Sequence, residues 1–225
     1  MSYKGYHALR SFIFDFGTKD IDFIVISKDA NIQNDYYQEI IDLCNNNSIK
    51  YYERRDNFEL KSEYAYAISW RWLIKTQNTK LIVFHDSLLP KYRGFAPLIT
   101  ALINRDKKLG VTALFASDEY DKGNIIAQSS VSISYPIKIM DAITYISDCY
   151  VSLIKSITFK ILNSEIISSI NQDEKDVTYS QWLDDKDYEI DWSFDAEYIK
   201  RFIDSVGYPY KGAMTFFEGK KARVL

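Results

Sequence analysis

The sequence predicts an α/β fold in which a mostly parallel sheet is flanked by helices and followed by a short C-terminal α+β extension. Short apolar runs that fit buried strands alternate with segments whose apolar residues recur at helical spacing, the pattern of parallel strands joined by crossover helices. The stretch 81–97 passes from a buried strand into a polar loop with Pro and Gly. Pro97 then stands where a first helical residue would, which predicts a helix over 98–104.

The N-terminal part supplies two helix–strand pairs. Apolar residues at helical spacing over 6–16 predict a helix, and residues 22–27 follow as an apolar strand. Asp35 and Gln38 have the spacing of a capping box, which predicts a second helix before a strand at 49–52. Such a domain usually starts with a strand. We therefore expect either that the first strand is absent or that the recorded start lies downstream of the natural one.

The central part contains the strands that we expect to form most of the sheet. They are separated by loops rich in Gly, Pro and Asp. The longest helix follows Pro136, because apolar residues recur at helical spacing over 139–161. The expected strands are 64–68, 81–85, 110–115 and 125–131.

After residue 162 the composition turns polar, which indicates a departure from the main domain. We therefore expect a main domain over 1–162 and an extension over 163–225, with a helix that Gly207 ends and a hairpin about Glu218-Gly219. Leu225 falls inside the second strand of that hairpin, which fits a truncated C-terminus.

Composition excludes several classes of function. With 47% apolar residues, 26% charged residues, a net charge of −3 and a pI near 5.5, the chain fits a globular protein without a basic field for nucleic acid or a polybasic membrane surface. No apolar run approaches the ~18 residues of a membrane span, and no signal peptide is evident, so we expect a cytoplasmic protein. Cys44 and Cys149 lie on apolar faces without metal spacing, which predicts buried thiols and no metal site.

His85 is the strongest candidate for acid–base chemistry. The sequence has two histidines, and His7 falls on the first predicted helix. His85 ends a buried strand, where ligands collect in an open parallel sheet. The alternative is a histidine that only hydrogen-bonds the loop it occupies.

Asp121 is the candidate partner of His85. It lies in an acidic turn between two strands expected to end near His85, and a carboxylate beside an imidazole orients the ring and stabilises its charged form. The alternative is an ordinary turn carboxylate ahead of Gly123. Ser87 has no nucleophile elbow around it, and the eight glycines form no phosphate-binding loop.

Separated motifs follow one another through the central part of the chain. They are His85-x-Ser87-Leu88-Leu89-Pro90-x-Tyr92-Arg93-Gly94-x-x-Pro97, Gly110-Val111-Thr112 and Asp121-x-Gly123-x-Ile125-x-x-Gln128. In this order they resemble the formyl-tetrahydrofolate-dependent formyltransferase family. That family includes methionyl-tRNA formyltransferase, glycinamide ribonucleotide formyltransferase and the sugar-nucleotide N-formyltransferases of surface-polysaccharide synthesis.

The C-terminal motifs narrow the resemblance. They are Tyr179-Ser180-x-Trp182, Ile190-Asp191-Trp192-Ser193 and Tyr208-Pro209-Tyr210-x-Gly212-Ala213. They resemble the segment that, in the sugar formyltransferases, helps to hold the nucleotide-sugar and often the dimer. The resemblance implies a Rossmann-like catalytic domain, formyl-tetrahydrofolate as co-substrate, a nucleotide-linked amino sugar as acceptor and a homodimer.

The resemblance also implies roles for particular residues. His85 acts as acid/base near the formyl group, and Asp121 orients it and helps to remove the amine proton. The expected cofactor-binding residues are Ile68, Ser69, Trp70, Asp118, Tyr120 and Asp121. The expected substrate-binding residues are Ser87, Leu88, Leu89, Pro90, Tyr92, Arg93, Gly94, Trp192 and Tyr210. For Arg93 a structural role, paired with a carboxylate under the loop, is an equal alternative. For Trp192 and Tyr210 the alternative is core packing.

One position departs from the family pattern. The family has an asparagine two residues before the histidine as a donor to the developing oxyanion, and here that position is Val83. Losing one such donor typically costs ~10²–10³ in rate, so activity could survive. Two alternatives therefore stay open: the same chemistry on methionyl-tRNA or another amine, and a degenerate homologue that binds folate or sugar without turnover.

Overall fold

The computed structural model describes residues 2–224 and has a four-stranded sheet at its centre, in the order β3-β4-β6-β7. β3 and β4 are parallel, with Ile68 opposite Phe84. The α/β fold is thereby confirmed, and two neighbouring pairs, β4–β6 and β6–β7, are antiparallel. The strands are β3 (Tyr64–Ile68), β4 (Lys80–His85), β6 (Lys108–Phe115) and β7 (Ile125–Ser132).

The antiparallel direction of β6 has a topological cause. The short helix α3 (Pro97–Ile103) does not carry the chain back along the sheet. The chain is therefore still at the carboxyl end of β4 when β6 begins, and β6 runs antiparallel to β4. His85 therefore pairs with Thr112 near the middle of β6, and β6 ends beside the start of β4. The sequence suggested that the turn after β6 begins next to His85, but it begins at the opposite end of β4. The turn has to fold back along the sheet to bring Asp121 to His85.

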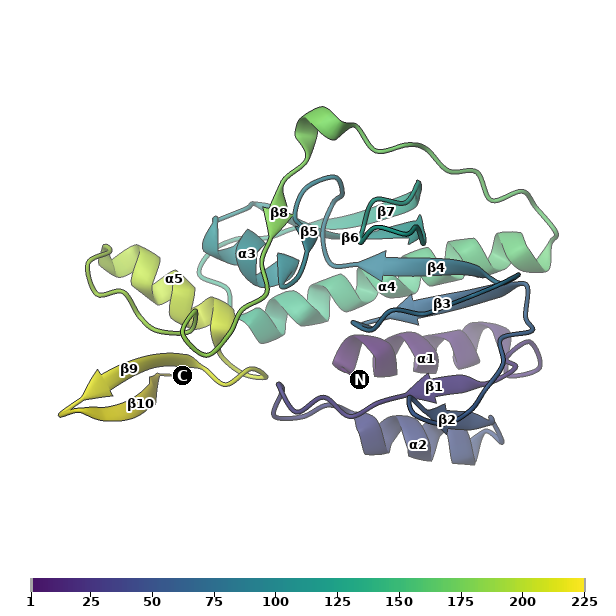
Figure 1. Cartoon of the computed structure of the whole chain (residues 1–225), viewed down its shortest axis with the longest axis horizontal. Coiled ribbons are helices and arrows are strands. Elements are labelled where there is room, and N and C mark those ends of the chain that lie inside the picture. The colour runs from purple at the N-terminus through teal and green to yellow at the C-terminus, as the bar shows by residue number, and fades with distance from the viewer. Residues whose placement is uncertain (1, 225) are drawn as a thin grey trace.

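Two helices, α1 (Tyr3–Phe16) and α4 (Ile139–Leu162), pack against each other and lie along the sheet in Figure 1. The apolar stripe predicted for the longest helix faces inward and joins Ile82 and Phe84 of β4 in the main hydrophobic cluster. The alternate residues of β4, Val83 and His85, point away from that cluster, as the pleat of a strand requires. His85 is thus mounted on a strand whose other face is fixed in the core.

A smaller layer precedes the sheet. β1 (Ile24–Ile26) and β2 (Tyr51–Glu53) form a parallel pair, and α2 (Tyr37–Asn46) lies between them in the chain. The predicted capping box is wrong. Tyr36 is the N-cap residue of α2, and Gln38 donates to Asp42 instead of reaching back.

The C-terminal part begins with residues 163–187, which we name the strap. Figure 1 shows it running from the end of α4 across the top of the molecule to β8 (Tyr179–Ser180), which pairs with β5 (Arg93–Gly94). Helix α5 (Ala196–Val206) and a hairpin of β9 (Ala213–Phe217) and β10 (Lys220–Val224) follow, as predicted. Val206 and Ala213 join the main hydrophobic cluster, so the extension shares the core.

Among residues 2–224, no helix has both the length and the apolar character that crossing a membrane requires.

Candidate active site

His85 and Asp121 meet at the end of β4, as the sequence predicted. The imidazole Nδ1 lies 3.3 Å from Asp121 Oδ1, and both side chains are close to nine-tenths buried. Nε2 lies 2.8 Å from the carbonyl oxygen of Tyr92, which can only accept. Both partners are acceptors, so the two contacts fix the direction in which each ring nitrogen points. The pair can therefore perform acid–base chemistry.

Asp121 reaches His85 because the turn after β6 folds tightly. Its Oδ2 accepts from the backbone N–H of Gly94 at 2.9 Å, which fixes the carboxylate between the site loop and the imidazole. Gly123 permits the fold: a Cβ at this position would lie 1.7 Å from the carbonyl oxygen of Phe115. The predicted turn glycine is required by this close approach rather than by its φ angle.

Strained backbone gathers around this pair. Ser69, Tyr92, Ala96 and Asp121 have φ angles between 49° and 59°, in the left-handed region that non-glycine residues rarely adopt. Each such residue costs about 1 kcal/mol or more and persists only where its surroundings hold it. Only Asp121 is of a residue type that is enriched at such angles, so the sequence does not signal the other three positions. Their clustering at the carboxyl ends of β3 and β4 is typical of a functional site.

The loop after His85 is held by an internal hydrogen-bond network. Ser87 Oγ donates to the carbonyl of Lys91 at 2.6 Å, and Thr112 Oγ1 donates to the carbonyl of Ser87 at 2.7 Å. The N–H of Leu89 donates to Thr112 Oγ1, and Gln128 Nε2 donates to the carbonyl of Leu89. The bonded atoms of Ser87 and Leu89 therefore maintain the loop itself. Leu88 packs against Gly110, where a Cβ would lie 2.5 Å from its Cδ2.

Arg93 takes the structural alternative. It is 1% exposed, and its guanidinium donates to Gln172 Oε1 at 2.8 and 3.0 Å and to Glu174 at 2.8 and 3.2 Å. Gln172 in turn donates to the carbonyls of Asp121 and Gly123. The guanidinium lowers the pKa of the Glu174 carboxyl below its ordinary value. Arg93 thus joins the strap to the turn that carries Asp121.

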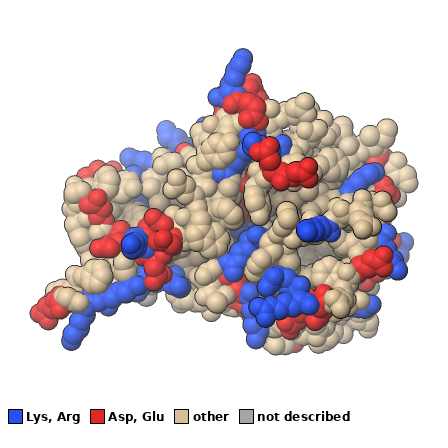
Figure 2. All heavy atoms as spheres, in the orientation of Figure 1, with Lys and Arg blue, Asp and Glu red and all other residues tan. Residues whose placement is uncertain are grey.

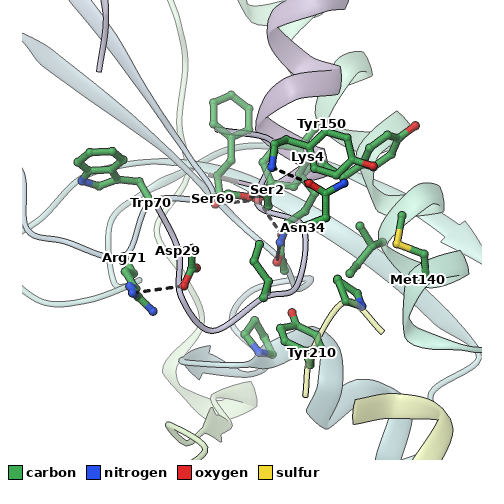
Figure 3. Close-up of a pocket in the computed structure, with 18 of the residues that line it drawn as sticks. Ser2, Lys4, Asp29, Asn34, Ser69, Trp70, Arg71, Met140, Tyr150 and Tyr210 are labelled. Carbon is green, nitrogen blue, oxygen red and sulfur yellow. Dashed lines mark hydrogen bonds and ion pairs between the residues drawn. The ribbon is translucent and has the colours of Figure 1, made fainter. Parts of the chain in front are cut away.

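A cavity of about 220 Å³ opens at the carboxyl ends of β3 and β4. Four of the predicted site residues line it: Ser69, Trp70, His85 and Tyr210. Figure 3 shows Trp70 and Arg71 on one side of the pocket and Met140 on the other. Among the described residues, the buried indole nitrogen of Trp70 has no hydrogen-bond partner. A buried donor without an acceptor is costly, and this nitrogen is closed off from solvent.

The other predicted site residues do not line this cavity: Ile68, Ser87, Leu88, Leu89, Pro90, Tyr92, Arg93, Gly94, Asp118, Tyr120, Asp121 and Trp192. Ile68 packs against the main core, and Asp118 and Tyr120 are exposed on the acidic turn. Trp192 is 62% exposed and donates to Thr215 Oγ1, away from the pocket. Proximity in sequence to His85 or Asp121 therefore does not by itself bring a side chain to the cavity.

Most residues of the pocket wall were not predicted as site residues, and three of these have polar side chains that form one connected group. Lys4, Asp86 and Tyr150 line the cavity and contact one another. A signal existed for Lys4, since it lies one turn before Ala8 on the buried face of the first helix, where a lysine is unusual.

Val83 has apolar surroundings. It packs against the cluster formed by Leu89, Leu114 and Ile125, on the same side of β4 as His85. The position where the resembled family has an amide donor is thus part of a small hydrophobic contact here.

The chain is similar in sequence to a known protein family. Residues 63–144 match the family model described as formyl transferase, and residues 183–225 match the formyl transferase C-terminal domain. Among curated proteins, methionyl-tRNA formyltransferase of Halothermothrix orenii is 33% identical over 146 residues, covering 64% of this chain and 45% of that protein. The chain spans about half the length of the curated relatives it matches.

Solved structures share the fold. A 4-N formyltransferase from Francisella tularensis aligns with a TM-score of 0.74 at 21% identity, over 96% of this chain and 91% of that one. The N-formyltransferase from Helicobacter canadensis, in complex with folinic acid and dTDP-3-aminofucose, aligns with a TM-score of 0.71 at 21% identity, over 91% of this chain and 77% of that one.

Proposed function

The chain belongs to the formyl transferase family, and we propose that it transfers a formyl group from formyl-tetrahydrofolate to the amine of a nucleotide-linked amino sugar. The observation that carries this proposal is the buried His85–Asp121 pair, whose imidazole lines a pocket at the ends of two strands. His85 takes the proton that the attacking amine releases and returns it to the folate nitrogen when the bond between that nitrogen and the formyl carbon breaks, while Asp121 keeps the ring oriented.

We assign the co-substrate to this pocket. Ser69 and Trp70, which the sequence predicts as cofactor contacts, lie in its wall together with His85. Formyl-tetrahydrofolate supplies the formyl carbon that the amine attacks. Asp118 and Tyr120, exposed on the acidic turn, stay predicted cofactor contacts for a bound state.

Charge and likeness of fold favour a sugar acceptor. The net charge is −3, and on the face shown in Figure 2 acidic and basic side chains are interspersed, without one large basic field of the kind that nucleic acid requires. The N-formyltransferase from Helicobacter canadensis was solved with dTDP-3-aminofucose. The expected homodimer and the roles of Trp192 and Tyr210 in holding the nucleotide-sugar belong to this proposal.

Two observations keep alternatives open. The curated relative named above is a methionyl-tRNA formyltransferase, which favours the same chemistry on methionyl-tRNA. Val83 cannot donate to an oxyanion from its side chain, which favours a homologue that binds without turnover.

One assay separates these functions. The protein is incubated with formyl-tetrahydrofolate and, in parallel, with a panel of nucleotide-linked amino sugars and with methionyl-tRNA, and the products are weighed by mass spectrometry. We expect a formyl mass gain on one amino sugar. A gain on methionyl-tRNA alone would select the first alternative. Binding of the folate by calorimetry without any gain would select the second.

A further inference from the structure

A second group of polar side chains lies against the main chain of His85, on the face of β4 opposite the imidazole. Lys4 comes from the first turn of α1, Asp86 follows β4, and Tyr150 comes from the middle of α4. Lys4 is 8% exposed and Tyr150 is 1% exposed. Figure 3 shows Lys4 and Tyr150 close together in the pocket wall. The acid–base pair does not use any of the three.

Tyr150 contacts the chain on both sides of His85. Its hydroxyl oxygen lies 3.2 Å from the carbonyl oxygen of Phe84 and 2.7 Å from Asp86 Oδ1. Burial and the neighbouring carboxylate raise the pKa of Tyr150 well above its ordinary value, so the hydroxyl stays protonated and donates. The hydroxyl carries one proton, and the shorter contact is the one to Asp86 Oδ1. Tyr150 thus holds the side chain that follows His85 and lies against the carbonyl group that precedes it.

Lys4 completes the group. Its ammonium forms an ion pair and hydrogen bond with Asp86 Oδ2, while Tyr150 occupies Oδ1. The Asp86 side chain is 16% exposed, so removing Lys4 would leave a carboxylate largely buried without its counter-charge. The carboxylate is therefore fixed from two helices, and through it so is the backbone that follows His85.

We propose that Lys4, Asp86 and Tyr150 are positioning residues for His85: they fix its main chain so that the ring, held on the other side by Asp121 and Tyr92, keeps one orientation toward the pocket. The contacts of the imidazole with Asp121 and Tyr92 determine where its nitrogen atoms point. The group of Lys4, Asp86 and Tyr150 fixes the position of the main chain that carries the imidazole. The inference rests on the proposed function only for its kinetic readout, since the orientation of the ring is measurable without a substrate.

The test compares Tyr150→Phe with Tyr66→Phe. Each variant loses one hydroxyl group, and in the wild type each ring lies 5.6–5.7 Å from the ring of Phe84, measured between centroids. The Tyr66 hydroxyl forms its hydrogen bond with Thr158, away from His85. The readout is the NMR spectrum of the two histidine rings, in which His7 serves as an internal reference. We expect Tyr150→Phe to shift and broaden the His85 ring signals and to leave His7 unchanged. Tyr66→Phe should move neither.

The kinetic arm uses the acceptor that the mass assay identifies. Tyr150→Phe should lower kcat about tenfold, because the His85 ring is misplaced. If no acceptor is found, the proposed function fails and the NMR arm still decides the positioning proposal.

A double-mutant cycle tests the ion pair. Lys4→Met and Asp86→Asn should each move the His85 signals, and the double variant should move them no further than the stronger single variant. The control is Lys155→Met, which removes another ion pair between α1 and α4, Lys155–Asp15, away from the site. His85 signals that stay at their wild-type positions in Tyr150→Phe and Asp86→Asn would overturn the proposal. So would equal shifts at His7, which would indicate a general loss of packing.

Discussion

The protein contains two histidine–aspartate pairs with nearly the same nitrogen–oxygen distance but different exposure to solvent. His7 Nε2 lies 3.2 Å from Asp148 Oδ1, and His85 Nδ1 lies 3.3 Å from Asp121 Oδ1. The first pair joins α1 to α4 at the surface, where 74% of the Asp148 side chain is exposed. The second is close to nine-tenths buried, and its imidazole lines the pocket. Distance alone does not make a catalytic pair.

The difference lies in what surrounds each pair. Water screens the surface pair, and such pairs contribute little. Around His85 the solvent is replaced by fixed groups: the carbonyl of Tyr92 on the ring, the N–H of Gly94 on the carboxylate, and the Tyr150 group behind the strand. Preorganised partners of this kind stabilise a charge as it develops. The predictions that follow alter one pair or its surroundings and use the other as reference.

The largest effect is expected from Asp121→Asn. An asparagine keeps the shape of the side chain and removes the charge that stabilises a protonated His85, so formyl transfer should fall about 10³-fold. The measurement is the initial rate at saturating formyl-tetrahydrofolate. Asp148→Asn is the matched control and should retain the wild-type rate. Equal losses in both variants would mean that burial does not distinguish the pairs.

A smaller effect, on folding, is expected from Gly123→Ala in the turn that carries Asp121. The new Cβ would meet the carbonyl of Phe115 at 1.7 Å, so the turn must open, at a cost of about 3 kcal/mol in the free energy of unfolding. Urea denaturation measures it. Gly207→Ala is the control, because its Cβ would meet only an ordinary contact at 3.5 Å. A neutral Gly123→Ala would contradict the fold of the turn.

Arg93→Met tests the connection from the strap to this turn. Loss of the guanidinium leaves the Gln172 and Glu174 side chains without their donor, so we expect a loss of about 2 kcal/mol and faster proteolysis within residues 163–187. Arg105→Met removes an exposed pair with Glu197 and should have no measurable effect. Unchanged proteolysis of Arg93→Met would show that β8 alone secures the strap.

The smallest effect concerns pH. Arg93 lowers the pKa of Glu174 below its ordinary value of 4.5, so this carboxylate contributes stability that is present above that value and lost as the pH falls through the lowered pKa. Hydrogen exchange of strap peptides, corrected for intrinsic rates, should quicken between pH 6 and pH 3. In Glu174→Gln the exchange should depend less on pH, and an unaltered dependence would argue against this pair.

The sequence predicted the features that follow from periodicity. Apolar runs located β3, β4 and β6, helical spacing located α1, α4 and α5, and the strand end located His85. Asp121 was identified because Asp and Gly residues mark a turn between strands. The path of that turn was not predicted, because the sequence does not show that β6 ends beside the start of β4, away from His85.

Other features could not be read from the sequence because long-range polar contacts determine them. The path of the strap depends on Gln172 and Glu174 meeting Arg93 about 80 residues away, and no local pattern encodes that contact. The left-handed backbone at Ser69 and Tyr92 occurs in residue types that do not favour it. The Lys4–Asp86–Tyr150 group joins α1, the end of β4 and α4, and its contacts depend on how these three elements are placed relative to one another.

The most direct test of the account is the rate of formyl transfer in His85→Ala compared with His7→Ala. Both variants remove one imidazole and leave one aspartate, Asp121 or Asp148, without its partner. The assay supplies formyl-tetrahydrofolate and the amino-sugar nucleotide that the panel identifies, and circular dichroism confirms that both variants are folded. We predict that His85→Ala loses at least about 10³-fold in rate, as Asp121→Asn does, and that His7→Ala keeps the wild-type rate. Full activity in a folded His85→Ala variant would contradict the account.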